Sequence, residues 1–353
     1  MKTYIDLEDM ANLNCSKVLD IIQKNGELSR KQISELTGLS WGGMTKIVNK
    51  LIESGYIVEN KISSSAKAGR APSFLSVNTH RNFVMGLDIN QTGLNAIVMN
   101  LKGEILKSYS KSPNLKCTAE LLNDITKFTS EIFDEFEEKA IISIGIAMQG
   151  IVDNEKGISV KFPAIKGWEN VDLKNILKEK FGVDVFIEHD PDCILYPYTL
   201  NNKKENLLLL RIDKSIGMAV AMKGKIIKGK GIFEIAHSIV VPGGKKCSCG
   251  NSGCLEAYLS PCIENDRIIP ENVAEFITPL SVSLYNLAGI FNIDKFIITG
   301  KLAESKALFK DKLKNELKAL NQSFELEFIE LSECAVQGAA LIAISKSINS
   351  LLI

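Results

Sequence analysis

The most restrictive feature of the sequence is a short segment that brings three cysteines and one histidine close together. The chain has eight cysteines and three histidines in 353 residues, and four of these fall within the eighteen residues from His237 to Cys254. The same segment contains four glycines, including Gly250 and Gly253 beside the cysteines. Such spacing is typical of a metal site, and the alternative is a chance cluster that contains a disulfide.

The composition of the chain favours the metal over the disulfide. At 353 residues and 45% hydrophobic content, the chain has enough apolar material for two or three domains. The opening segment "MKTYIDLEDMANL" has early acidic residues and no long apolar run, so neither a secretory signal nor a membrane anchor is expected. No stretch reaches the roughly 20 apolar residues that span a bilayer. We therefore expect a soluble cytoplasmic protein, in which thiols stay reduced and available to metals.

The residue types of the cluster indicate which metal it would hold. One imidazole and three thiolates form a closed tetrahedral set that suits structural zinc and leaves no position for a catalytic water. Glycines beside the cysteines let a short loop fold its thiolates toward one point. We predict Zn²⁺ bound by His237, Cys247, Cys249 and Cys254. The alternative is that some of these cysteines are only buried or oxidised. The other cysteines are scattered and expected in the core: Cys15, Cys117, Cys193, Cys262 and Cys334.

Three short helices with tight turns are predicted between residues 14 and 60. Ser29 and Gln32 form a capping-box pattern at the start of the second helix, and Gly38 follows its end. Ser40 precedes a third helix with apolar residues at helical spacing. This succession is the pattern of a helix-turn-helix.

A wing and a local excess of basic residues accompany these helices. Two short strands are predicted to flank the Ser-, Ala- and Gly-rich loop at 62–72. From Asn14 to Asn78 there are nine Lys/Arg and five Asp/Glu, whereas the rest of the chain from 79 carries 32 and 34. The basic excess therefore belongs to the small domain, and we predict that it binds DNA. The alternative is that the three helices make only protein contacts.

Particular residues of the third helix and the wing are the candidates to contact DNA. They are Ser40, Thr45, Lys46, Asn49, Lys67 and Arg70. Arg70, in the sequence "AGRAP", is expected to enter a minor groove. Gly42 and Gly43 are unusual in such a helix, because each glycine costs a helix roughly 1 kcal/mol. They either let the backbone approach DNA closely or mark a soft first turn.

The rest of the chain alternates strands and helices in two similar rounds. Each round reads as a meander of strands with helices and a further strand, which predicts an α/β protein with a ligand cleft between two lobes. The predicted domains are a winged helix-turn-helix at 1–79, a first lobe at 80–190 and a second lobe at 191–353.

With these residues placed, the sequence resembles the ROK family of repressors, open reading frames and sugar kinases. The specific element is the run C-x-C-G-x-x-G-C-x-E that begins at Cys247, preceded by Glu234 and His237. Weaker support comes from residues 166–190 and from "GLDINQT" at 86–92. The resemblance implies a two-lobed, actin-like sugar-kinase (ribonuclease H-like) fold after the winged helix, which itself is typical of the repressor branch. The interval from the last cysteine of the motif to "FIITG" is some twenty residues shorter than usual in the family, so a helix of the second lobe is expected to be trimmed.

The resemblance also implies a set of sugar-binding residues. In the family, the positions of Glu234, His237, Glu256 and Asp190 bind sugar hydroxyls. His189 stands where the kinases usually have asparagine, and it can still donate a hydrogen bond. Glu234 lies three residues before His237, so a helical turn places both side chains on the same side.

Each of these assignments has a plainer alternative. Asp190 precedes Pro191, and this pair could simply be the N-cap and first residue of a helix. Glu256 could be an ordinary surface carboxylate. Ala236 replaces the usual glycine and Ala164 a frequent asparagine, so the identity of the sugar is not predicted.

Three phosphate-binding turns of the family's kinases are altered in this sequence. Asp-x-Gly-Gly-Thr is replaced by residues 88–92, "DINQT", and a Gly-Thr-Gly run is replaced by "DKS" at 213–215. A Gly-Gly pair is replaced by Gly300 and Lys301. Because glycine-rich turns hold ATP phosphates by their backbone amides, we predict that ATP is not bound and that no residue is catalytic.

Together these observations predict a sugar-responsive transcriptional regulator, most simply a repressor of carbohydrate-utilisation genes. A monosaccharide or amino-sugar would shift a homodimer, or a tetramer built from it, to a state whose winged helices no longer match operator DNA. One alternative is a ROK sugar kinase with an atypical nucleotide loop. The other is a regulator that responds to a protein partner instead of a sugar.

Overall fold

The computed structural model describes most of the chain in several segments. The described residues are 7–61, 73–113, 115–136, 141–202, 204–228, 233–264, 267–320, 324–330 and 334–350. The predicted DNA-contact residues Lys67 and Arg70 lie outside them.

The N-terminal residues form the predicted winged helix-turn-helix. Its elements are α1 (Leu7–Asn25), α2 (Arg30–Thr37), α3 (Trp41–Glu53), β1 (Ile57–Lys61) and β2 (Ser73–Val77). The capping box is confirmed, because the Ser29 side chain accepts from the backbone N–H of Gln32 and the Gln32 side chain accepts in return from the backbone N–H of Ser29. Gly38 ends α2 in the left-handed conformation, as predicted. The first helix begins at Leu7, seven residues earlier than the sequence pattern indicates.

A five-stranded sheet follows the winged helix. Its strands lie in the order β10-β6-β3-β4-β5. Their bounds are β3 (Phe83–Asn90), β4 (Gly93–Met99), β5 (Ile105–Lys111), β6 (Ile141–Met148) and β10 (Asp184–His189). The intervening elements are α4 (Thr118–Glu135), β7 (Ile151–Asp153), β8 (Ile158–Lys161), β9 (Glu169–Val171) and α5 (Leu173–Phe181).

A second five-stranded sheet has the order β13-β12-β11-β16-β17. Its strands are β11 (Leu207–Ile212), β12 (Ile216–Met222), β13 (Lys225–Ile226), β16 (Lys295–Thr299) and β17 (Glu325–Phe328). The helices of this half are α6 (Asp190–Asn201), α7 (Leu255–Leu259), α8 (Pro270–Phe291), α9 (Lys301–Glu304) and α10 (Lys310–Ala319). Its short elements are β14 (Ile263–Glu264), β15 (Arg267–Ile268) and three 3₁₀ turns (Ile235–His237, Ser260–Cys262 and Lys306–Leu308). The last helix of the chain is α11 (Cys334–Ser350).

The two sheets have the same topology. Each sheet begins with three consecutive antiparallel strands. A later strand then pairs in parallel with the first of these three, β6 with β3 in one sheet and β16 with β11 in the other. This repetition confirms the predicted duplicated α/β fold. The described residues divide into two compact units, one of 1–150, 154–188 and 339–353 and the other of 151–153 and 189–338. The division at residues 79 and 190 stays a prediction.

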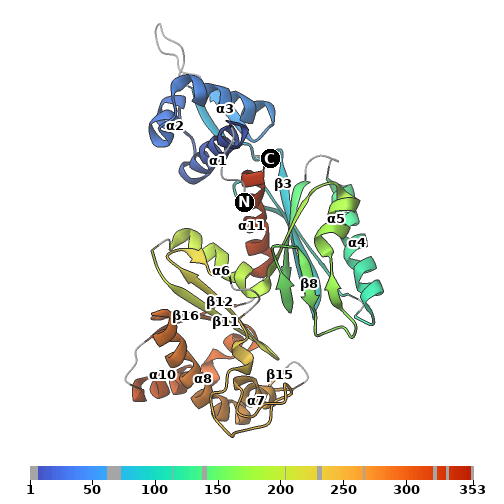
Figure 1. Ribbon diagram of the computed structural model, residues 1–353, viewed down its shortest axis with the longest axis vertical. Coiled ribbons are helices and arrows are strands. Elements are labelled where there is room, and N and C mark those ends of the chain that lie inside the picture. Colours follow the sequence, from blue (N-terminus) through green and yellow to red (C-terminus); the bar gives the residue numbers. More distant parts are fainter. Residues whose placement is uncertain are drawn as a thin grey trace. The chain divides into compact units, whose positions relative to one another are not determined.

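The core of the second unit lies between its sheet and the helices α7, α8 and α10. Figure 1 shows α6 on one side of β11 and β12 and α8 and α10 on the other. Phe276, Leu280 and Leu284 of α8 are completely buried in this core together with Leu208 and Phe296 from the strands. In the described part of the chain, α8 is the one helix with the length and apolar composition of a membrane span. Its buried face shows that it packs as the core helix of this unit.

Candidate metal centre and effector site

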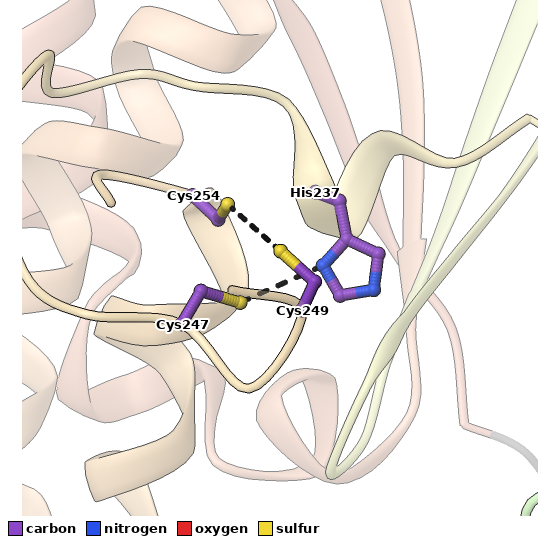
Figure 2. A group of neighbouring side chains, drawn as sticks. All are labelled: His237, Cys247, Cys249 and Cys254. Carbon is purple, nitrogen blue, oxygen red and sulfur yellow. Dashed lines mark hydrogen bonds between the residues drawn. The ribbon is translucent and has the colours of Figure 1, made fainter. Parts of the chain in front are cut away.

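The four residues of the cysteine and histidine cluster converge in the structure. The ligand atoms of His237, Cys247, Cys249 and Cys254 all lie within 4.8 Å of one another. The Sγ atom of Cys247 is 3.6 Å from Nδ1 of His237, and the sulfurs of Cys249 and Cys254 are also 3.6 Å apart (Figure 2). All eight cysteines are free thiols, so the disulfide alternative is not supported.

Tight turns of the backbone bring these side chains together. The N–H of Gly250 donates to the carbonyl of Cys247 at 3.0 Å, and the N–H of Cys247 donates to the carbonyl of Asn251 at 3.0 Å. The two glycines adopt positive φ values, 94° at Gly250 and 86° at Gly253, which other residues rarely adopt. Cys254 is fully buried as the N-cap residue of α7. The turns at these glycines therefore bring the cysteine side chains together, as the sequence predicts.

The chemistry of the donor set fits a zinc ion. Burial, with smaller effects from the neighbouring thiols, raises the pKa of Cys254 to about 12. A backbone hydrogen bond from Asn251 lowers the pKa of Cys249. A buried thiol with such a high pKa loses its proton readily only when a cation is beside it. Three sulfurs and one imidazole nitrogen at this spacing would supply the four ligands of a closed zinc site.

The two glycines of the cluster offer a matched test of this loop. A Cβ atom at Gly253 would lie 1.8 Å from the carbonyl oxygen of Val241, whereas at Gly250 it would meet nothing within 4 Å. We expect Gly250→Ala to cost about 1 kcal/mol from backbone strain alone. Gly253→Ala should cost roughly 2–3 kcal/mol because the overlapping backbone must also move.

The measurement is the denaturation midpoint and zinc content of both variants. Gly253→Ala should bind less than one zinc per chain, while Gly250→Ala should bind as much as the unaltered protein. Equal losses of stability in the two variants would contradict this account of the turn.

His189 and Asp190 lie at the junction of β10 and α6. His189 is the N-cap of α6 and makes no side-chain capping bond, so the alternative that Asp190 caps this helix is wrong. The Asp190 carboxylate, whose side chain is 4% exposed, forms an ion pair with the guanidinium of Arg211. Nε2 of His189 lies 3.5 Å from Oδ1 of Asp190. The two predicted sugar ligands therefore form one buried polar cluster.

Arg211 links this cluster to Glu256 and was not among the residues predicted from the sequence. Its Nε donates to Oδ2 of Asp213 at 2.7 Å, and the N–H of Asp213 donates to the carbonyl of Ser215 at 3.0 Å. The Ser215 hydroxyl then donates to Oε2 of Glu256 at 2.7 Å. The signal that could have identified Arg211 is its position as the one charged residue in the apolar strand "LLLLRI".

Glu234 and His237 belong to one 3₁₀ turn, as the spacing predicts. The N–H of His237 donates to the carbonyl of Glu234 at 3.2 Å. Glu234 is exposed, and its carboxylate makes no hydrogen bond to any residue that the structure describes. Because His237 is also a predicted zinc ligand, a metal at the cluster would fix the turn that carries Glu234.

In two of the three turns at which the sequence differs from the family's kinases, side-chain oxygens accept hydrogen bonds from backbone N–H groups. Oδ1 of Asn90 accepts hydrogen bonds from the backbone N–H groups of Thr92 at 2.8 Å and Gly93 at 3.0 Å. Oδ1 of Asp213 accepts from the N–H of Lys301 at 2.9 Å. The backbone N–H groups of Thr92, Gly93 and Lys301 are thus hydrogen-bonded within the chain.

The predicted DNA-contact residues of α3 differ in their surroundings. The Ser40 hydroxyl caps the helix by accepting from the N–H of Gly43 at 3.3 Å. The Thr45 hydroxyl donates to the carbonyl of Trp41 at 2.8 Å. Lys46 and Asn49 are exposed on the face opposite the buried residues of the helix.

Comparison with known proteins identifies the family of this chain. Residues 84–265, just over half of the chain, match the ROK family, and residues 16–58 match a winged helix-turn-helix DNA-binding domain. The chain therefore belongs to the ROK family, as the cysteine motif indicated. It is similar to the xylose repressor of Caldicellulosiruptor bescii, with 27% identity over 97% of both chains. It is also similar to the repressor Mlc of Escherichia coli, with 28% identity over 72% of this chain and 64% of Mlc.

Solved structures confirm the fold along the whole chain. A ROK family transcriptional regulator, a homologue of E. coli Mlc, superposes with a TM-score of 0.82 and 21% identity over 98% of both chains. A ROK glucokinase from Streptomyces griseus, solved with glucose and AMPPNP, gives a TM-score of 0.59 and 17% identity over 74% of this chain and 99% of its own. The regulator thus matches this chain from end to end, whereas the kinase matches about three quarters of it.

Proposed function

We propose that this protein is a cytoplasmic, sugar-responsive transcriptional regulator that represses genes by binding operator DNA. The main support for this proposal is that one chain contains both a winged helix-turn-helix and a ROK domain. Relatives that match 97% and 89% of the chain are named xylose repressors, from Caldicellulosiruptor bescii and Bacillus subtilis. The local excess of basic residues in the small domain supports contact with DNA.

The effector in this proposal is a monosaccharide or an amino-sugar. Its hydroxyls would be bound by carboxylates and imidazoles from Asp190, His189, Glu234, Glu256 and His237. Carboxylates suit this task because each oxygen accepts hydrogen bonds from hydroxyl groups. The support for these two classes is that related proteins are named for xylose and for N-acetylglucosamine.

Zinc has a structural role in this proposal. Held by His237, Cys247, Cys249 and Cys254, it would supply no chemistry to a reaction but would fix two sugar-binding carboxylates. Glu234 lies on the same turn as His237, and Glu256 follows Cys254 by two residues in α7. A metal that joins these turns would orient both carboxylates toward one ligand.

The proposal excludes the sugar-kinase alternative. Its support is that Asn90 and Asp213 supply internal acceptors to backbone N–H groups at positions where the family's kinases bind phosphate. Phosphate oxygens would have to displace these acceptors, and the negative charge of Asp213 would oppose them.

The regulatory step is a population shift in a homodimer, with a tetramer as the alternative assembly. Sugar would bind more tightly to one of two states, and only the other state would present paired winged helices at the spacing of two operator half-sites. The sugar therefore acts as an inducer in this proposal.

The first experiment is a thermal-shift panel of monosaccharides and amino-sugars on zinc-loaded protein, with and without Mg-ATP. A sugar at a hundred times its Kd should add about 2.7 kcal/mol to the free energy of unfolding. Because hydrogen bonds to charged groups contribute about 1.5–3 kcal/mol, Glu234→Gln and Glu256→Gln should each weaken that sugar about 10-fold or more. Glu131→Gln on the exposed surface of α4 is the matched control and should bind normally.

Operator release completes the test. The sugar that stabilises the protein should lower its affinity for operator DNA, and it should do so more weakly in Glu234→Gln. Tight sugar binding with unchanged operator affinity would contradict the proposed regulation. A shift with Mg-ATP together with consumption of nucleotide would instead support the kinase.

A further inference from the structure

The exposed face of α3 carries an apolar residue that the sequence analysis did not assign to any role. Trp41, the first residue of this helix, is 59% exposed. The chain has only two tryptophans, and the other, Trp168, is 1% exposed with its indole N–H donating to the Ser159 hydroxyl at 2.8 Å. An exposed indole combines a large apolar surface with an N–H donor, and tryptophan is enriched where proteins contact other molecules.

Gly42, beside this tryptophan, has no function inside the chain that requires glycine. It lies in regular helix without a positive φ, and a Cβ atom there would meet nothing within 4 Å. Glycine is among the least favourable residues for a helix. The missing side chain leaves room on the outside of the helix, and a molecule that docks there would have this clearance.

The remaining exposed residues of this surface are polar or basic. We define the outer face of α3 as Trp41, Gly42, Thr45, Lys46 and Asn49. Lys46 and Asn49 lie opposite the buried Met44 and Val48, whereas Trp41 is exposed as the first residue of the helix. The exposed charged residues of α3 are Lys46, Lys50 and Glu53, a net charge of +1, within a domain segment that has nine basic and five acidic residues. Its charge is complementary to a polyanion, and we therefore take DNA as the molecule that binds this face.

We propose that Trp41 is a specificity-determining residue that packs against a thymine methyl group in the major groove. This inference rests on the proposed DNA-binding function and adds the chemistry of the recognised base. The thymine C5 methyl is the apolar group that base pairs present in the major groove, so it is the natural partner of an exposed indole. Gly42 provides the clearance for the duplex to reach the ring, while Lys46 and Asn49 contact phosphates or neighbouring bases.

The test uses the full-length protein and duplexes selected from a random-sequence library. The tightest selected duplex is resynthesised with each dT replaced in turn by dU, which removes only the methyl group. We expect one or two positions at which the methyl contributes about fourfold to affinity, the size given by one buried methyl group. In Trp41→Ala this preference for dT over dU should disappear, and the affinity should fall at least tenfold.

Two pairs of variants separate this role from a general change in the protein. Ile290→Ala removes another exposed apolar residue, 73% exposed on α8, and should leave DNA affinity unchanged. Gly42→Ala should weaken DNA binding about tenfold while slightly raising the melting temperature. Gly289→Ala, at an exposed helical glycine of α8 whose Cβ also meets nothing within 4 Å, should raise the melting temperature alone.

The possible outcomes distinguish this inference from the proposed function. If the unaltered protein selects no duplex, the DNA-binding function fails and this inference fails with it. If it selects duplexes but Trp41→Ala retains their affinity and the same preference for dT, the function stands and the role of Trp41 is refuted. A loss of affinity that is equal for dT and dU duplexes would also refute the contact with the methyl group.

Discussion

Replacing Cys249 with serine is expected to release the metal from the cluster and to destabilise the segment from His237 to Leu259. Structural zinc contributes roughly 10–16 kcal/mol of apparent binding free energy in small metal-dependent domains, so loss of one of four ligands should cost several kcal/mol. The Cys249 residue is exposed, so its replacement removes little packing. A fall in the stability of this variant would therefore reflect loss of the metal and not loss of core packing.

The measurements are the zinc content per chain and the thermal midpoint of the purified protein. Cys117→Ser is the matched control. The expectation that Cys117 lies in the core is wrong, because this cysteine is exposed at the N-cap of α4. Serine is a favourable N-cap residue, so this control should keep its zinc and at least its original stability. Full zinc content in Cys249→Ser would contradict a four-ligand site.

The elements that the sequence predicted well are those specified by local chemistry. Ser29 with Gln32 and the following Gly38 fix the bounds of α2 because the side chains and the backbone conformation act within a few residues. The cysteine motif is equally local, since its four ligands come from eighteen residues. Its convergence in the structure follows from turns that glycine permits.

The polar network of the candidate effector site could not be predicted in the same way. Arg211 contacts Asp190 across 21 positions of sequence, and Ser215 contacts Glu256 across 41. Such pairs depend on how strands and helices pack, and no short-range pattern encodes them. The alternative that Asp190 only caps a helix is wrong, because Asp190 is the first residue of α6 and pairs with Arg211 of β11.

Trp41 was overlooked for a different reason. In a sequence, a tryptophan at the start of a helix is expected to help build the core, because large aromatic side chains usually do. Its exposure at the start of α3, beside a glycine with free space around it, becomes visible only in the folded domain. Exposure is a property of the tertiary structure and has no local signature.

Replacing Arg211 with methionine is the second change for which we expect a large effect. The side chain of Arg211 is 11% exposed and that of Asp190 is 4%, so their ion pair is largely removed from water. Asp213, at 13%, shares the same guanidinium. Breaking a buried pair by removing one partner costs about 3–5 kcal/mol, because the remaining charges lose their compensation. Arg211→Met should therefore melt markedly lower than the unaltered protein.

The same variant should also lose sugar binding if Asp190 is a sugar ligand. The guanidinium holds both carboxylates in a fixed geometry through separate nitrogens, and lysine cannot reproduce this fork. Arg211→Lys should accordingly regain part of the stability but little of the sugar affinity. A protein that merely needed a positive charge at this position would regain both in parallel.

A matched control and a double variant make this prediction specific. Lys228→Met removes a cation that is paired with Asp192 but is 37% exposed, so its cost should be smaller than that of Arg211→Met. Adding Asp213→Asn to Arg211→Met should recover stability, because one of the two uncompensated carboxylates is then neutral. If Arg211→Met were no less stable than Lys228→Met, the network around Asp190 would not be a determinant of the fold. The link from Glu256 through Ser215 and Arg211 to Asp190 would then lose its structural basis.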